Sequence, residues 1–110
     1  MGRKLGTVII SPAVLATIAR LTTLSVPGVA RMSPLAMHRL LGARGSHGMK
    51  VQVVDEAVVL DLYIIATTDA HLLQLSREVQ SKVTRAIHEI VGMAVREVNV
   101  HIVDVEAVQV

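Results

Sequence analysis

The sequence has 110 residues and no cysteine, tryptophan or phenylalanine. Without cysteine there are no disulfides, no thiolate nucleophile and no thiolate metal ligand. Tyr63 is the only aromatic residue, so the chain lacks the series of stacking side chains on which single-stranded nucleic acids bind. These absences exclude thiol enzymes and disfavour nucleic-acid binding.

Long apolar runs are also missing. The longest, residues 57–66, is short and carries Asp61, so no segment is predicted to span a bilayer. Between Arg3 and Lys4 and the following Pro12 there is no apolar run of about 7–15 residues, the length of a signal-peptide core. Together with the lack of cysteine, this predicts a soluble, cytoplasmic protein.

The first half of the chain has no acidic residue. Residues 1–50 contain seven lysines and arginines and no acid (+7), residues 51–110 contain nine acids and four bases (−5), and the sum is the net charge of +2. Halves of opposite sign can pair within a molecule, pair between molecules, or leave a basic face for an anionic partner or membrane surface. The candidates for such a basic face are Arg20, Arg31, Arg39, Arg44 and Lys50.

The first half predicts a strand and one or two helices. Residues 5–10 are rich in β-branched side chains, which predicts a strand. Ser11 and Pro12 are a helix-start signal, and Pro27 and Gly28 are expected to end that helix. Ser33 and Pro34 repeat the start signal and predict a second, shorter helix, with an extended segment at 29–32 as the alternative.

The second half predicts a hairpin, a long helix and a last strand. Residues 49–54 and 57–66 alternate as strands around a turn at Asp55 and Glu56. A helix is expected from a cap at Asp69 to Val91, with Gly92 as its stop, and residues 95–103 form the last strand. The predicted class is α+β, a two-layer sandwich of order β-α-(α)-β-β-α-β with the helices on one face of a mixed four-stranded sheet. Residues 1–110 form a single domain.

Several segments in this order resemble the bacterial alkaline shock protein family, which is associated with envelope stress in Gram-positive bacteria. The matching segments are 6–11, 27–29, 58–64, 79–83 and 98–102. The chain departs from the family at Thr67 and Thr68, where members often carry a Tyr-Gly pair, and in the loop at 42–48. The resemblance implies a non-catalytic cytoplasmic factor of envelope homeostasis that self-associates or docks to a partner, such as a small membrane-anchor protein, and it supplies no catalytic residues.

The residues themselves contain no catalytic pattern. None of the five histidines stands in a metal-ligand motif such as H-E-x-x-H, and no phosphate-binding or nucleophile-elbow motif is present. Asp55 and Glu56 are adjacent carboxylates, but a tight turn explains them. We therefore expect no enzyme activity, no metal and no cofactor, and membrane contact only at the periphery or through a partner.

Two surfaces remain as candidates for function. On the strand at 57–66, one set of alternate side chains is apolar and predicted to face the core, so the opposite set would form an open sheet face. The alternative is that the segment at residues 30–41 folds over this face. The interface candidates on that face are Val59, Tyr63, Ile65 and Val103. The alternative is RNA binding by the glycine loop Gly42–Gly45, whose G-x-x-G pattern resembles the backbone clamp of KH domains.

Overall fold

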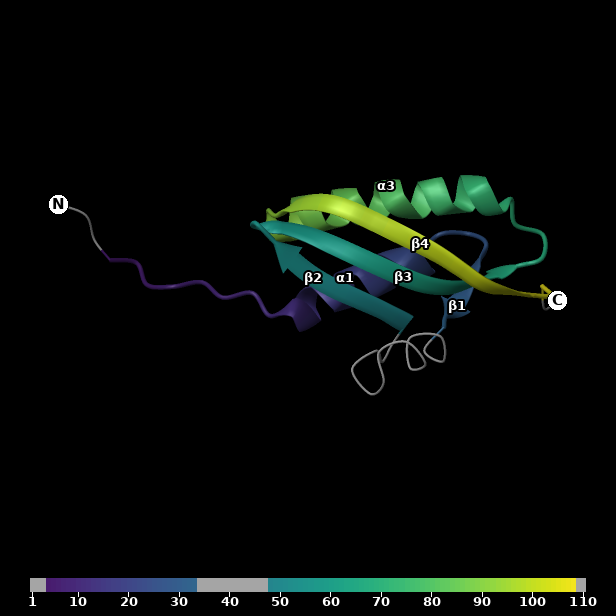
Figure 1. The fold of residues 1–110 in the computed structure, drawn as a ribbon, viewed down its shortest axis with the longest axis horizontal. Helices are drawn as coiled ribbons and strands as arrows, with labels where there is room; N and C mark the ends of the chain where they lie inside the picture. Colours follow the sequence, from purple (N-terminus) through teal and green to yellow (C-terminus); the bar gives the residue numbers. More distant parts are fainter. Residues whose placement is uncertain (1–3, 34–47, 109–110) are drawn as a thin grey trace.

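The computed structural model describes residues 4–33 and 48–108. Its elements, in chain order, are α1 (Pro12–Leu24), β1 (Val29–Met32), β2 (Met49–Val54), β3 (Ala57–Thr67), α3 (Leu72–Val91) and β4 (Ala94–Glu106). The strands form one four-stranded sheet, and both helices lie on the same side of it, behind the strands in Figure 1. The predicted α+β sandwich with a mixed sheet is confirmed.

The first helix begins where the sequence predicts. The Ser11 hydroxyl accepts a hydrogen bond from the amide of Ala13, and Pro12 occupies the first turn. The helix buries Leu15, Ala19 and Thr23, which recur every four residues along one face. Val14 and Leu21 are also apolar but about half exposed, so the buried stripe is narrower than the apolar pattern of this helix.

The central hairpin pairs β2 with β3 in antiparallel register, from Met49 opposite Leu62 to Val54 opposite Ala57. The two turn residues between them, Asp55 and Glu56, both have positive φ, 49° and 65°. Two such residues define the type of tight turn that matches the twist of a two-residue hairpin. The turn interpretation of these carboxylates is thus confirmed.

The long helix α3 connects β3 to β4. Its N-cap is His71, whose ring accepts from the amide of Gln74, and not Asp69 as predicted. Asp69 is engaged earlier, because its carboxylate accepts a 2.6 Å hydrogen bond from the Thr67 hydroxyl. The helix ends as expected at Gly92, in the left-handed conformation with φ 83°.

β3 is the central strand of the four-stranded sheet, with β4 on one side and both β1 and β2 on the other. β4 runs parallel to β3 and pairs with it along its whole length, from Ala57 opposite Ala94 to Thr67 opposite Glu106. β1 and β2 are antiparallel to β3 and share its other edge, with β1 opposite residues 64–66 and β2 opposite residues 57–62. β1, β2 and β4 are therefore all edge strands of the described sheet, and β2 and β4 are the longer ones.

The core lies between the sheet and the two helices. All four inward side chains of β3, predicted from the alternation, are 0% exposed: Val58, Leu60, Leu62 and Ile64. Against them pack Leu15 and Ala19 of α1, and from α3 the buried row Leu75, Val79, Val83 and Ile87. Thus both helices cover one face of the sheet.

Two expectations for the first half need correction. Residues 5–10 form no strand; they extend away from the body of the fold, with no neighbouring strand to take up their backbone hydrogen bonds (Figure 1). The strand of the first half is β1, the extended alternative at 29–32, where Met32 pairs with Ile64. The predicted second helix and most of the glycine loop fall in residues 34–47, outside the described residues.

Candidate functional site: the outer face of the sheet

The side of the sheet opposite the helices is called here the outer face. It carries Val59, Asp61 and Tyr63 of β3, which alternate with the buried core residues. The parallel register places a β4 side chain beside each of them, in the pairs Val59–Glu97, Asp61–Asn99 and Tyr63–His101. Because every second side chain of each strand points to this side, the outward side chains of β3 and β4 form two parallel rows on the outer face.

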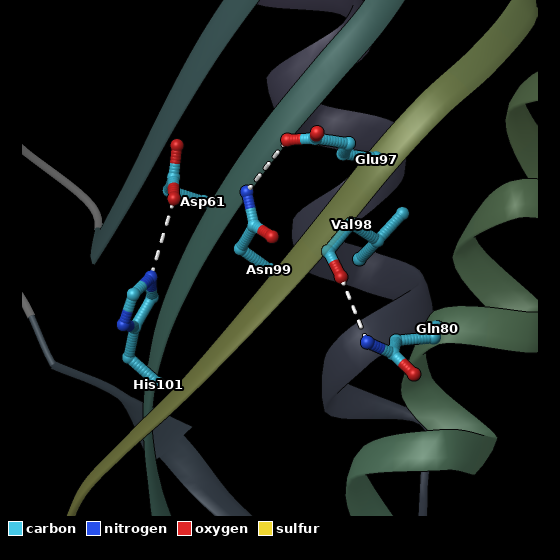
Figure 2. A network of polar contacts seen from close by, with 6 residues as sticks. All are labelled: Asp61, Gln80, Glu97, Val98, Asn99 and His101. Carbon is cyan, nitrogen blue, oxygen red and sulfur yellow. Dashed lines mark hydrogen bonds and ion pairs between the residues drawn. The ribbon is translucent and has the colours of Figure 1, made fainter.

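The centre of the outer face is an aromatic pair. The rings of Tyr63 and His101 are stacked, with centroids 4.4 Å apart and planes within 7°. His101 Nε2 also lies 3.2 Å from Asp61 Oδ1, and Figure 2 shows this contact running along the sheet surface. The imidazole is therefore fixed by a ring on one side and by a carboxylate at its edge.

The polar side chains beside this pair are also engaged. Asn99 donates to Glu97 at 3.4 Å on the outer face. Gln80 approaches β4 from α3 and donates to the carbonyl of Val98 at 3.0 Å, so it satisfies a backbone group at the edge of the sheet (Figure 2). Lys50 stands opposite Asp61 on β2, so a basic side chain flanks this carboxylate on the side away from β4.

The four predicted interface residues have unequal exposure. Val59 and Tyr63 are partly exposed on the outer face. Val103 is 42% exposed and lies at a β-bulge, where the partner of β3 jumps from Ile102 to Asp104. Ile65 is only 6% exposed, so it offers little surface to a partner.

A long-range ion pair lies near Ile65. Arg31 on β1 stands opposite Ile65, and its Nε lies 2.7 Å from Oε1 of Glu106 on β4. Because β1 and β4 flank β3 on opposite sides, this ion pair joins the two strands on either side of β3. Sequence reasoning missed this pair, since nothing local connects residues 75 positions apart.

The proposed basic face is not gathered into one surface by the described residues. Arg20 lies on α1, Arg31 is paired with Glu106, and Lys50 is on β2. Arg39 and Arg44 fall outside the described residues, as do Gly42 and Gly45 of the alternative RNA-binding loop. At least one contact between the oppositely charged halves is therefore internal.

A hollow of about 470 Å³ lies on the helix side, between α1 and the start of β2. Its lining is mainly small and apolar, from Ala13, Ala16, Thr17, Arg20 and Met49. Within residues 4–33 and 48–108, no group of three or more His, Asp or Glu side chains is placed to hold a metal ion. The outer face is thus the best-organised candidate site.

The family comparison decides the relationship of the chain. The model of the alkaline shock protein 23 family, described by a cell envelope-related function, matches residues 1–107. The chain belongs to this family. The resemblance found in the sequence is thereby confirmed, and the match includes the residues that precede α1.

Two curated relatives come from Bacillus subtilis (strain 168). The uncharacterized protein YqhY is 26% identical over 106 residues, which are 93% of this chain and 78% of YqhY. The uncharacterized protein YloU is 30% identical over 57 residues, which are 52% of this chain and 48% of YloU. Their names assign no activity.

Among solved structures, the fold is similar to that of the MamM CTD. Two variants of that domain match with a TM-score of 0.52 at 16% and 14% identity, over 87% and 88% of this chain and 96% of each matched chain. At this identity the similarity shows the fold alone. In the part of this chain that the structure describes, no helix is long and apolar enough to cross a bilayer.

Proposed function

We propose that this protein is a non-catalytic assembly or adaptor protein that acts in the envelope stress response or in envelope homeostasis. It works by self-association, or by docking to a partner protein, through the outer face of its sheet. The observation that carries the proposal is that α1 and α3 both pack on one side of the sheet, so that the described elements leave the other side open (Figure 1).

The composition of the outer face supports docking. Tyr63 is a rigid amphipathic side chain of the kind that is enriched at interface hot spots. Its stacking on His101 and the contact of His101 with Asp61 order the surface before a partner arrives. Binding then costs less side-chain entropy than it would on a surface of free side chains.

The absence of catalysis is supported by how the carboxylates of the outer face are used. Asp61 contacts His101, and Glu97 accepts from Asn99, so both acids serve neighbouring side chains. Within the described residues, no group of three or more His, Asp or Glu side chains is placed to hold a metal ion. The arrangement orients a surface and leaves no group directed at a substrate.

The setting of the proposal comes from the family. A cell envelope-related function describes the family, and we place the protein in the cytoplasm, at the inner side of the envelope. A small membrane-anchor protein is the proposed heterologous partner, so that contact with the membrane is peripheral or indirect.

The proposal is tested by sedimentation of the purified chain. Tyr63→Asp combined with Val59→Lys replaces the apolar and aromatic surface at the centre of the outer face with charged side chains, and we expect it to weaken self-association strongly. Ser81→Asp, on the exposed side of α3, is the matched control and should sediment as wild type. An oligomer that survives the outer-face double variant would contradict assembly through this face.

A further inference from the structure

The residues before α1 form an exposed apolar segment. Residues 4–11, called here the arm, form neither helix nor strand and project away from the sheet (Figure 1). Leu5, Val8 and Ile9 are 90%, 88% and 86% exposed. Apolar exposure on this scale within one short segment indicates a surface that is covered in the working assembly. Residues 5–10 have the composition of a strand but lack a neighbouring strand.

The edge of the sheet formed by β2 has backbone groups that lack a neighbouring strand among the described residues. In a two-residue hairpin the residues flanking the turn, Val54 and Ala57, form a hydrogen-bonded pair, and hydrogen-bonded and non-bonded pairs then alternate. Met49, Val51 and Val53 therefore direct their N–H and C=O groups away from β3. Among the described residues, no backbone hydrogen bond joins this edge of β2 to another element.

The opposite edge of the sheet is protected. Gln80 occupies the outward carbonyl of Val98 on β4. Register shifts between Val58 and Val59, and between Ile64 and Ile65, also place irregularities in the pairing of β4. Capped groups and bulges discourage the addition of a strand, so of the two longer edge strands β2 is the open one, and β1 has only four residues.

We propose that the arm of one copy adds as a strand to the free edge of β2 in a second copy, and that the exchange is reciprocal. Residues 5–10 match the six residues of β2 in length. In antiparallel orientation Lys4 lies beside the acidic turn of Asp55 and Glu56, whereas in parallel orientation it lies beside Lys50. Charge therefore selects the antiparallel arrangement.

The antiparallel arrangement requires a second molecule. α1 begins at the end of the sheet where the turn of the β2–β3 hairpin lies, and the arm leaves from there (Figure 1). An arm that folded back onto its own β2 would run parallel to it, with Lys4 near Lys50. Only the β2 of another copy accepts the arm in the charge-matched direction, and reciprocal exchange closes the assembly at two copies.

This inference shares with the proposed function only the claim that the protein self-associates. The surfaces differ, because the exchange uses the arm and the edge of β2 and not the outer face. The arm is disabled by Val8→Asp with Ile9→Asp. The acceptor is disabled by Val51→Pro, which removes an outward N–H and leaves the pairing with β3 intact. Val53→Pro is a second acceptor variant, in case the first does not fold. Val100→Pro blocks the β4 edge equivalently and serves as the control.

Sedimentation of each variant, and of mixtures, tests the exchange. The arm variant and the acceptor variant should each dissociate at least about tenfold more readily than wild type. An equimolar mixture of the two should regain a heterodimer, because one intact arm meets one intact β2. The Val100→Pro control should match wild type. Melting curves confirm that each variant is folded.

Other outcomes overturn the exchange. A folded arm variant with wild-type mass, a mixture without complementation, or dissociation only in Val100→Pro contradicts it. If Tyr63→Asp with Val59→Lys dissociates the protein while the arm and acceptor variants do not, the exchange is wrong and the proposed function stands. If the arm and acceptor variants dissociate the protein while Tyr63→Asp with Val59→Lys does not, the exchange stands and self-association through the outer face is wrong.

Discussion

At the scale of single residues, the outer face is organised by Tyr63, which stacks on His101 of the neighbouring strand. Alternation along β3 correctly placed Tyr63 opposite the core side chains, because a strand allows only two faces. The stacking of Tyr63 on His101 follows from the parallel register with β4, which local pattern does not specify. The Arg31–Glu106 ion pair was beyond prediction, since its two residues are brought together only by the pairing of β1 and β4 with β3.

The Tyr63–His101 stack should be measurable as a coupling. In a double-mutant cycle with Tyr63→Ala and His101→Ala, urea unfolding should give an interaction free energy of about 0.5–1.5 kcal/mol, the range for aromatic pairs. Additive single substitutions would show that the rings are adjacent but energetically independent.

Gly48 should be the more sensitive of two glycines with positive φ. A Cβ at Gly48 would lie 2.9 Å from the amide nitrogen of Ser33 and 3.1 Å from the carbonyl oxygen of Tyr63, whereas at Gly92 it meets nothing within 4 Å. We expect Gly92→Ala to lower the free energy of unfolding by about 1–2 kcal/mol through the left-handed backbone alone. Gly48→Ala should cost about 2–5 kcal/mol because overpacking is added. Urea melts that rank the two in the opposite order would contradict this.

Among the elements, the hairpin and α3 were predicted closely and the first strand was not. The hairpin is local, with turn residues and alternation in one short segment, and α3 has a long apolar period. Residues 5–10 have strand composition, but composition cannot supply the neighbouring strand that a ladder requires. β1 is stabilised by pairing with residues 64–66, a long-range contact invisible in its own four residues.

Two isoleucines on α3 test the observed packing of this helix. Both Ile87 and Ile90 fit the apolar period, yet Ile87 is 0% exposed and Ile90 is 68% exposed. Ile87→Ala should lower the free energy of unfolding by about 2–5 kcal/mol, through lost burial and a cavity. Ile90→Ala should change it by no more than about 0.5 kcal/mol. Equal effects in chemical denaturation would mean that α3 is rotated from the described position.

For the whole molecule, the charge asymmetry has at least one internal use. Arg31 and Glu106 join the basic first half to the acidic second half, so the split in sign does not by itself require a partner. The open outer face is then the stronger argument for assembly. Association through a largely desolvated aromatic patch should resist salt, whereas association between opposite charges should weaken as screening increases.

The most direct test of the central claim is the mass in solution by light scattering, across protein concentration at low and at high salt. We predict an oligomer at both salt concentrations. Tyr63→Asp with Val59→Lys should raise its dissociation constant about thirtyfold or more, the effect of losing a hot spot worth ~2 kcal/mol. A strict monomer at high micromolar concentration, or an oligomer that the double variant leaves unchanged, would contradict self-association through the outer face.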